Sequence, residues 1–324
     1  MTEQKHTNIW VLTDDRTGNS VQAIALAQNL GEDFTIKHLE YNFLAKLPNF
    51  LLGTSCIYII EKTKETLKTT HPPKLIISSG RRTAGIAAYL KKHYTNVKLV
   101  QIMKPDIDAD KFDLIALPQH DVFKDDSAHI IRTIGAIHNI PARIEQHRAQ
   151  PPMDSFIGVL IGGNTKEYKF SKHDAIELST ILERASEASG IPAFITFSRR
   201  TPEMLKQLFI KKFSSPHVIY DPTTSKEDNP FLSILKYAKF LIITCDSVSM
   251  CSEAASTGHP LYIYTPERFA SKKHKYFTQQ LIDIAIARPI TTHSYALEEY
   301  KYTPLNEVTK VAKLAMDLIN PHTK

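Results

Sequence analysis

The chain has 324 residues, of which 42% are hydrophobic and 23% charged, and its formal net charge is +6. This composition is typical of globular proteins and excludes wholesale disorder, and the length suits two domains better than one. No apolar run reaches the roughly 18 residues that a membrane span needs, and no basic run is long enough to indicate a nucleic-acid partner.

We expect a cytoplasmic protein, because residues 1–8 are polar and resemble neither a secretory signal nor a transit peptide. The mild positive charge suits anionic ligands or an anionic membrane surface, so peripheral association with an inner membrane remains open. Cys56, Cys245 and Cys251 form neither a disulfide framework nor a zinc pattern, and we expect buried thiols in a reducing compartment.

Strand-like and helix-like runs alternate through the first half of the chain. Residues 9–13 lead to a helix near 20–29, and residues 75–78 lead to a helix near 84–92. Further short apolar runs lie at residues 56–60, 97–102 and 114–117. These runs are continuous and rich in β-branched residues, which is typical of parallel strands buried on both faces.

A polar segment bounded by prolines, residues 141–152, predicts a linker, and the alternation restarts after it. We expect strands at 156–161, 193–197, 218–220, 240–244 and, last, 261–264, with helices at 174–189, 202–212 and 230–238. Ser171 and Asp174 form a capping pair for the first of these helices. Residues 306–320 predict an amphipathic helix whose inward side chains are Val308, Val311, Ala312, Ala315 and Leu318.

Repeated strand–helix alternation predicts an α/β fold with parallel sheets covered by helices. We expect two Rossmann-like domains that face an interdomain cleft: residues 1–148, joined by the C-terminal helix 303–324, and residues 149–302. Ligands bind such sheets beyond the carboxyl ends of the strands, so the loops that follow strands carry the candidate site residues.

The first of these loops places Asp14, Asp15 and Arg16 directly after a strand, where charges without partners are costly. Asp15 is a candidate general base. Two adjacent acids are a weak metal signal, and we expect no metal site. The alternative interpretation is a turn that Asn19 or Ser20 caps.

Two loops, one in each half, carry Arg-Arg-Thr after a strand. Gly80, Arg81 and Arg82 follow one strand, and Arg199 and Arg200 follow another, after Ser198. Paired guanidinium groups at equivalent loops favour an anion-binding cleft, with the first set on the acceptor side together with Arg16. A single such tripeptide would indicate surface charge only.

Gly162, Gly163 and Asn164 follow a further strand, where paired glycines suit phosphate binding but also form ordinary turns. The segment 240–260 reads as a strand, a turn and a helix that ends at a glycine. The first turns of that helix contain hydroxyl and carboxyl groups, namely Asp246, Ser247, Ser249, Ser252 and Glu253.

A helix N-terminus beyond a buried strand attracts anions, and a carboxylate beside it could accept ribose hydroxyl groups. The alternative is helix capping, which accounts for one or two of these side chains. It does not account for Glu253, because a capping box needs Ser or Thr at position 250, which is Met.

His120, beside Asp121 after a strand, is a second candidate base, although a structural loop histidine is the more ordinary interpretation. Walker A, complete G-x-G-x-x-G and G-x-S-x-G sequences are absent from the chain. Their absence disfavours a P-loop nucleotide hydrolase, a nicotinamide-dependent dehydrogenase and a serine hydrolase.

The loop motifs together resemble the bacterial relatives of the plant "elongated mitochondria" (ELM) fission factor. The motifs are WVLTDDRTGN at 10–19, SGRRT at 79–83, GGN at 162–164, TFSRRTP at 196–202, NPF at 229–231 and TCDSVSMCSEA at 244–254. That family is similar in fold to GT-B glycosyltransferases, and its bacterial members are often labelled sugar-nucleotide epimerases. The resemblance implies a C-terminal helix that returns to the N-terminal domain, and a nucleotide sugar bound mainly by the C-terminal domain. The counterparts by position are Gly162, Gly163, Ser198, Arg199, Ser247, Ser249 and Glu253.

We therefore expect metal-independent transfer of a sugar from a nucleotide sugar to an envelope-type lipid or glycan acceptor, with no further cofactor. Arg199 and Arg200 would stabilise the leaving diphosphate, and Asp15 or His120 would deprotonate the acceptor. A sugar-nucleotide 2-epimerase is a close variant. A non-catalytic scaffold that recruits a protein or membrane partner is the alternative from another class.

Overall fold

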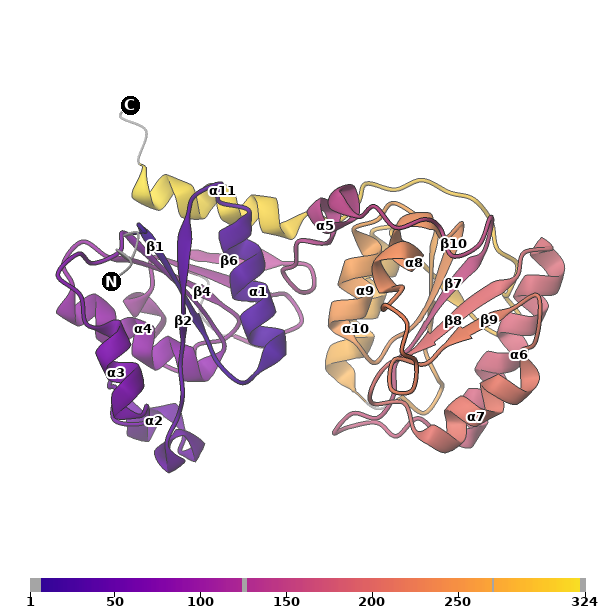
Figure 1. Cartoon of the computed structure of the whole chain (residues 1–324), viewed down its shortest axis with the longest axis horizontal. Coiled ribbons are helices and arrows are strands. Elements are labelled where there is room, and N and C mark those ends of the chain that lie inside the picture. The colour runs from indigo at the N-terminus through magenta and orange to yellow at the C-terminus, as the bar shows by residue number, and fades with distance from the viewer. Residues whose placement is uncertain (1–6, 124–126, 270, 321–324) are drawn as a thin grey trace. The chain divides into compact units, whose positions relative to one another are not determined.

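The computed structural model describes residues 7–123, 127–269 and 271–320. These residues belong to two compact units (Figure 1). Unit 1 consists of residues 1–139 and 306–324, and unit 2 of residues 140–305. Each unit contains a six-stranded sheet in which all strand pairs are parallel.

The unit 1 sheet has the strand order β2-β1-β3-β4-β5-β6. Its strands are β1 (Ile9–Thr13), β2 (Phe34–His38), β3 (Leu75–Ser79), β4 (Lys98–Ile102), β5 (Leu114–Pro118) and β6 (Ile130–Thr133). The α-helices of unit 1 are α1 (Thr17–Gln28), α2 (Asn49–Leu52), α3 (Glu61–Leu67), α4 (Arg81–His93) and α11 (Glu307–Ile319).

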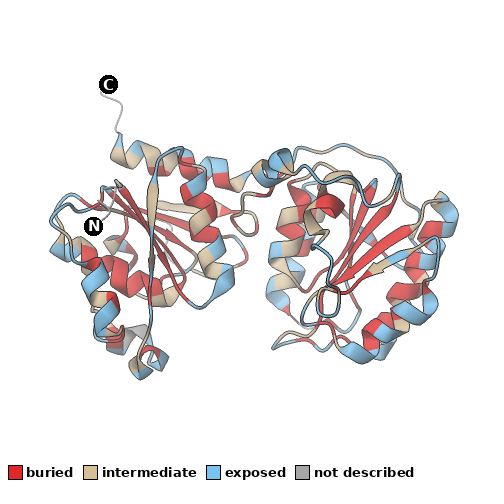
Figure 2. Ribbon diagram, in the orientation of Figure 1, coloured by how far each residue is buried: buried red, intermediate tan, exposed pale blue. Residues whose placement is uncertain are grey.

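Successive residues of these strands contribute to two different cores, because side chains along a strand alternate between the two faces of the sheet. One core, covered by α4, contains Trp10, Leu12, Ile76, Leu99 and Ile115. The other, covered by α1 and α11, contains Ile9, Val11, Leu75, Ile77 and Val100. Both faces are buried, which explains why the strands read as continuous apolar runs (Figure 2).

Helix α11 brings the chain from unit 2 back to unit 1. Val308, Val311, Ala312 and Ala315 are buried against α1 and the sheet, as their helical spacing predicts. Leu318 packs at the edge of the same core and remains partly exposed.

One predicted strand of unit 1 is wrong, and two strands were not predicted. Residues 56–60 form only an isolated antiparallel bridge, between Tyr41 and Ile59. Their apolar character reflects burial of Tyr58 and Ile59 against the core around α4, not a place in the sheet. Strands β2 and β6 lie at the two edges of the sheet, and most of their residues are partly exposed, so they lack a continuous apolar run.

The unit 2 sheet has the order β9-β8-β7-β10-β11-β12, which is the strand order of Rossmann sheets. Its strands are β7 (Ile157–Ile161), β8 (Ala193–Phe197), β9 (Val218–Tyr220), β10 (Phe240–Thr244), β11 (Leu261–Tyr264) and β12 (Ala287–Ile290). Its helices are α5 (Ile140–Gln146), α6 (Lys172–Ser189), α7 (Glu203–Lys212), α8 (Phe231–Tyr237), α9 (Val248–Ala255) and α10 (Lys272–Asp283). The predicted capping box of α6 is present, since Ser171 and Asp174 exchange side-chain and backbone hydrogen bonds.

Three elements of unit 2 differ from the sequence-based expectation. Strand β11 is not the last, because α10 and β12 follow it. Pro289 within β12 argues against a strand, but β12 is an edge strand, where proline is tolerated.

The segment expected to be a linker contains helix α5, with Pro141 in its first turn. Nε2 of His147 lies 2.7 Å from the Ser233 hydroxyl, and Lys236 donates to the His147 carbonyl at 2.6 Å. These contacts attach α5 and the residues after it to α8, so the division between the compact units precedes α5. Among the described residues, no helix is both long and apolar enough to cross a membrane.

Candidate functional site

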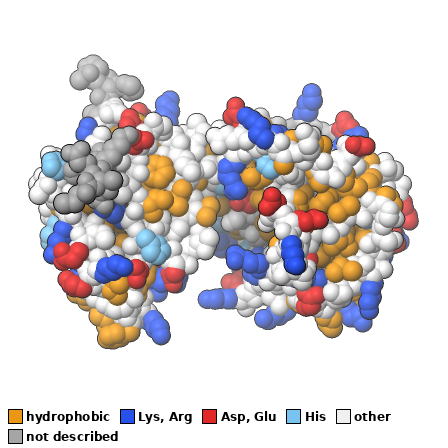
Figure 3. Space-filling model, viewed as in Figure 1, with side chains coloured by type: hydrophobic (Ala, Val, Ile, Leu, Met, Phe, Trp, Pro, Cys, Tyr) orange, Lys and Arg blue, Asp and Glu red, His pale blue; other side chains and the backbone are white. Residues whose placement is uncertain are grey.

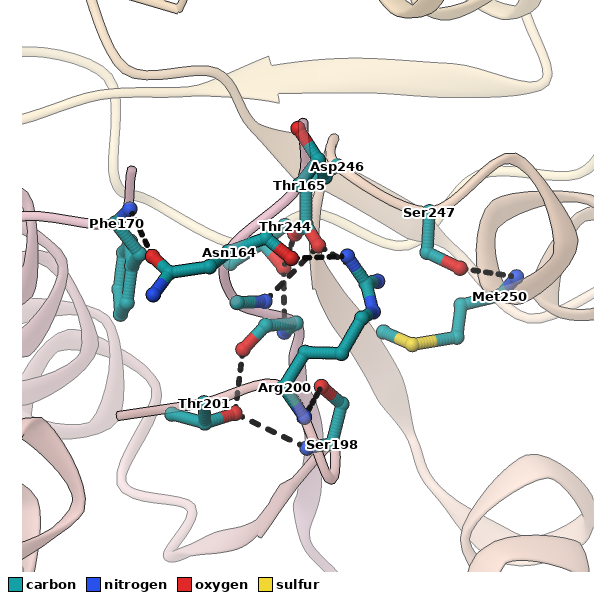
Figure 4. Close-up of polar contacts among 12 residues, drawn as sticks. Asn164, Thr165, Phe170, Ser198, Arg200, Thr201, Thr244, Asp246, Ser247 and Met250 are labelled. Atoms are coloured by element: carbon teal, nitrogen blue, oxygen red, sulfur yellow. Dashed lines mark hydrogen bonds and ion pairs between the residues drawn. The ribbon is translucent and has the colours of Figure 1, made fainter. Parts of the chain in front are cut away.

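The strand order of unit 2 brings three of the predicted site loops together. Strands β10, β7 and β8 are neighbours, so the loops that follow them adjoin at the carboxyl edge of the sheet. The chain continues from β7 to β8 on one side and, later, adds β10 on the other, which is the switch point where such sheets bind ligands. Figure 4 shows the side chains that meet there.

The carboxylate of Asp246 is the centre of this cluster. Thr244 donates its hydroxyl to Asp246 Oδ1 at 2.7 Å, and the Gly163 amide donates to Oδ2 at 2.9 Å. The guanidinium of Arg200 pairs with the same Oδ2 at 2.9 Å. Asp246 is buried, and its side chain is 3% exposed, so these donors and the cation compensate for the loss of solvation. The predicted ligand-binding carboxylate is thus engaged within the protein.

Gly162 and Gly163 are required by the packing of this cluster. A Cβ atom on Gly162 would overlap the Asp246 carboxylate, and one on Gly163 would overlap the Arg200 backbone. The Gly162 amide donates to the Thr244 hydroxyl, and the Gly163 amide donates to Asp246. Both amides are used internally, which corrects the expectation that they bind phosphate directly: the glycines seat the Asp246–Arg200 pair.

The loop after β8 is held by its own hydrogen bonds. The Ser198 hydroxyl accepts from the Arg200 amide at 3.0 Å, so this predicted ligand group stabilises the turn. Arg200 also donates to the Asn164 carbonyl at 3.0 Å, and the Asn164 amide donates to the Arg200 carbonyl. Arg199 is exposed, and the Arg200 side chain is 41% exposed, so both cations are accessible to an anion.

The start of α9 contains both capping and open groups. Ser247 caps the helix by accepting from the Met250 amide at 3.3 Å, which is the simpler of the two interpretations of this residue. Ser252 is buried and donates to the Val248 carbonyl at 2.7 Å, so it is not accessible to a ligand, contrary to expectation. Ser249 is exposed at the first turn of α9.

Glu253 lies on α9 one turn after Ser249 and is partly buried. Burial raises the pKa of Glu253 to about 7, and the positive charge of Arg143 on α5 opposes that shift. The carboxyl group therefore changes its charge near neutral pH, which a solvated glutamate does not do.

His274 on α10 is influenced by the charges of Asp246 and Arg200, and it was not predicted from the sequence. Its Nδ1 lies 2.7 Å from the Ser271 hydroxyl. Burial lowers the pKa of His274, the negative charges of Asp246 and Glu167 raise it, and Lys273 and Arg200 lower it. The signal that could have revealed it was its position after β11, in a helix that we did not predict.

The cysteines supply no activated nucleophile. Burial raises the pKa of Cys245 to about 12 and that of Cys251 well above its ordinary value. Cys56 is only partly buried, unlike the expectation, and burial raises its pKa to about 12 as well.

Among the described residues, one group has metal-ligand side chains close together: His173, Asp174 and Glu177. The Asp174 carboxylate accepts from Tyr168 and Ser171 and caps α6. Tyr264 donates its hydroxyl to Glu177 at 2.6 Å. These hydrogen bonds give both acids a structural role at the start of α6, outside the three loops described above.

In unit 1, Arg82 joins the loops after β1 and β3. Its guanidinium pairs with Asp14 at 2.9 Å, contacts Asp15, and lies 4.5 Å above the Tyr41 ring. Asp14 is buried with its side chain 1% exposed, whereas Asp15 is exposed. The hydrogen bond from Arg82 lowers the pKa of Asp15, which makes this carboxylate a weaker base than we expected.

The other predicted acceptor-side residues of unit 1 are also placed by the fold. Gly80 has a φ of +77°, and a Cβ there would overlap the Asn19 side chain, so this glycine accommodates Asn19. Arg81 lies in the first turn of α4 and donates to the Leu47 carbonyl at 3.1 Å. Arg16 is exposed at the N-cap position of α1.

His120 and Asp15 follow strands that are not neighbours in the sheet. His120 is buried in the turn after β5, and β5 is three strands along the sheet from β1. Neighbouring strands are about 4.8 Å apart, so the ends of these two strands are separated by about 14 Å. The two candidate bases therefore occupy different places on the edge of the unit 1 sheet.

The comparisons with known sequences identify a family. The model of the family described as "Mitochondrial fission ELM1" matches residues 17–318. "Uncharacterized protein RP120" of Rickettsia prowazekii is 43% identical to this chain, over 95% of this chain and 97% of its own length. "Mitochondrial fission protein ELM1" of Arabidopsis thaliana is 26% identical over 74% of this chain, which spans 62% of that protein.

Solved structures are similar in fold at low sequence identity. UDP-GlcNAc 2-epimerase from Methanocaldococcus jannaschii matches 96% of this chain and 99% of its own, with a TM-score of 0.56 and 12% identity. The structure of that enzyme in complex with UDP-GlcNAc and UDP also matches 96% of this chain and 99% of its own, with a TM-score of 0.50 and 11% identity. The glycotransferase of kitacinnamycin matches 97% of this chain and 90% of its own, with a TM-score of 0.52 and 10% identity. The predicted fold class, two Rossmann-like α/β domains of the GT-B type, is confirmed.

Proposed function

Because this chain belongs to the mitochondrial fission ELM1 family and has a GT-B-like fold, we propose that it binds a nucleotide sugar on unit 2 and transfers the sugar to an acceptor. The observation that carries the proposal is the Asp246–Arg200 pair at the switch point of the unit 2 sheet. This pair fixes a guanidinium at the sheet edge, where such folds bind ligands. Arg199 and the start of α9 leave further anion-binding groups open beside it.

The open groups match the parts of a nucleotide sugar. The diphosphate would lie against Arg199, the exposed side of Arg200 and the positive end of the α9 dipole. These groups would stabilise the charge that develops on the leaving diphosphate, so transfer would proceed without a bound metal. Glu253, ionised above about pH 7, would accept hydrogen bonds from ribose hydroxyl groups.

Calorimetric titration with UDP-, GDP-, CMP- and dTDP-sugars tests the donor proposal. We expect one nucleotide to bind the wild type measurably and Arg199→Ala to bind it about tenfold more weakly, because a charge-assisted hydrogen bond is lost. Lys211→Ala, which removes an exposed cation at the end of α7, is the matched control and should bind like the wild type. Equal affinities for all three proteins would remove Arg199 from the site.

A sugar-nucleotide 2-epimerase is the second candidate, and His274 favours it. This histidine adds an acid–base group whose pKa responds to Asp246, within the same unit. Inversion at C2 that breaks the C2–H bond exchanges that hydrogen with solvent, whereas sugar transfer leaves it in place. Epimerisation would be supported if the wild type incorporates deuterium at C2 during incubation in D2O and the His274→Ala variant does not. Acceptor-dependent release of nucleotide without deuterium would support transfer to an envelope-type lipid or glycan acceptor.

A non-catalytic scaffold remains the candidate from another class, because the Arabidopsis relative is described as a mitochondrial fission protein. Such a protein would keep the fold without needing a nucleotide. If none of the nucleotide sugars binds a folded wild-type protein in calorimetry, this candidate replaces the enzyme.

A further inference from the structure

Residues 42–58 of unit 1 form a long loop whose two ends are hydrogen-bonded to each other. We name it the apolar loop. Tyr41 and Ile59 form an antiparallel bridge just outside it. The Asn42 amide donates to the Tyr58 carbonyl at 3.0 Å, and the Asn42 side chain donates to the Ile57 carbonyl at 2.8 Å. Such compact loops with joined ends are frequently functional.

The inner side of the apolar loop is fixed to the core. Ala45, Leu52 and Tyr58 are buried with the residues around α4. The Tyr58 hydroxyl donates to the Arg82 carbonyl at 3.0 Å. A Cβ on Gly85 of α4 would lie 2.5 Å from that hydroxyl and 2.9 Å from the Gly53 carbonyl, so the loop backbone packs directly on the helix. The loop is thus attached without help from its outer residues.

The outer side of the apolar loop is nevertheless hydrophobic. Phe43 is 78% exposed, Leu51 59%, Ile57 53% and Leu47 40%. Figure 3 shows hydrophobic side chains grouped over the part of unit 1 where α2 lies. Single exposed apolar residues are ordinary, but a group within one loop marks an interaction surface. The buried residues already attach the loop to the core, so its exposed apolar side chains are not required for folding. We infer that they form a binding surface.

The charge around the loop indicates which partner fits. Between residues 41 and 100 the sequence has ten Lys and Arg residues and two acids, although Glu40 directly precedes this segment and five of the cations pair with acids. Lys46 is the loop's only charged residue, it is exposed, and Arg81 is fixed to the loop by its bond to the Leu47 carbonyl. Helix α4, on which the loop packs, ends in Lys91, Lys92 and His93, of which Lys91 pairs with Asp113.

An apolar face with the cations Lys46 and Arg81 beside it has the two properties that favour binding to an anionic lipid surface. A second copy of the chain fits less well, because two such faces would bring Lys46 and its neighbours against like charges. We propose that the apolar loop inserts Phe43, Leu51 and Ile57 into the surface of an anionic membrane. This contact goes beyond the proposed sugar transfer and does not depend on it.

Cosedimentation with vesicles tests the proposal. The full-length wild type should sediment with vesicles of phosphatidylcholine containing phosphatidylglycerol, and far less with phosphatidylcholine alone. The double substitution Phe43→Ser with Leu51→Ser should lower partitioning at least about tenfold, because it removes two apolar side chains that the membrane would bury. The matched control is Val122→Ser with Met204→Ser, two residues that are 87% and 71% exposed outside the loop. Its partitioning should equal that of the wild type.

Lys46→Glu should reduce the preference for anionic vesicles while leaving the apolar residues in place. Calorimetry with the nucleotide that binds unit 2 then separates the two proposals, because the loop variants should retain wild-type affinity for it. The membrane proposal is overturned if the wild type sediments with neither vesicle, or if the Phe43/Leu51 variant sediments like the wild type. A wild-type dimer that this variant converts to a monomer, without vesicle binding, would assign the face to self-association instead.

Discussion

The guanidinium of Arg200 lies 2.9 Å from the buried carboxylate of Asp246, and these residues follow strands on opposite sides of β7. Unit 1 contains a similar pair: Arg82 lies 2.9 Å from the buried carboxylate of Asp14, again joining loops after different strands. In each unit an arginine from an Arg-Arg-Thr sequence holds a strand-end aspartate at the switch point of its sheet. Because these ion pairs fix the loops, we expect the loss of either arginine to lower stability.

Gly162→Ala should destabilise unit 2 by about 2–3 kcal/mol, because the new Cβ would overlap the Asp246 carboxylate and the packed site has no room to yield. Urea unfolding followed by circular dichroism measures the change. The control is Gly18→Ala in α1, where a Cβ meets nothing within 4 Å. This control should match or slightly exceed wild-type stability, because alanine favours helix. An equal loss in both variants would contradict the packing argument.

Arg199→Ala and Arg200→Ala should separate binding from stability. Arg199 is exposed, so its loss should weaken nucleotide binding without changing the free energy of unfolding. Arg200 compensates the buried Asp246, so its loss should also cost about 3 kcal/mol of stability. Thermal denaturation beside calorimetry tests both variants. Equal stabilities for the two would show that the Arg200–Asp246 pair contributes little to folding.

Glu253 should make stability depend on pH. Its pKa of about 7 in the folded protein exceeds the ordinary 4.5, so folding favours the protonated carboxyl group. The wild type should therefore lose stability as pH rises from about 4.5 to 7, by an amount of order 1–3 kcal/mol. Glu253→Gln resembles the protonated form and should remove this loss. Unfolding free energies across that range measure the difference, and parallel profiles for both proteins would refute the assignment.

The same residue should couple nucleotide binding to pH. If ionised Glu253 accepts ribose hydroxyl groups, affinity should weaken as pH falls below about 7. Glu253→Gln should bind about tenfold to a hundredfold more weakly at high pH, with less pH dependence, because a charge-assisted hydrogen bond contributes about 1.5–3 kcal/mol. Calorimetry at several pH values is the measurement. An unaltered dissociation constant would exclude Glu253 from the nucleotide site.

Arg82→Ala should destabilise unit 1 by about 3–5 kcal/mol, because it leaves Asp14 buried without a cation and removes the contact with the Tyr41 ring. The control is Arg16→Ala, an exposed position in the same part of unit 1, where we expect no measurable change. Differential scanning calorimetry compares the two. A small loss for Arg82→Ala would mean that water replaces the guanidinium around Asp14.

The fold class and most buried elements could be predicted from the sequence, because strands such as β7 and β10 are covered on both faces and read as continuous apolar runs. Edge strands β2, β6 and β12 escaped prediction because they are partly exposed and lack that pattern. The loops that meet at the unit 2 site were also predicted, since strand ends in parallel sheets share one edge.

The roles within those loops were decided only by tertiary contacts. Spacing along the chain cannot show that Gly163 donates to Asp246, a residue 83 positions away, or that Ser252 turns into the core. Nor can it show that the hydrogen bond from Arg82 lowers the pKa of Asp15, or that burial lowers the pKa of His274 while the charge of Asp246 raises it. A residue type and a strand end indicate where chemistry can occur. Which donors are already satisfied depends on partners that only folding brings within hydrogen-bond distance.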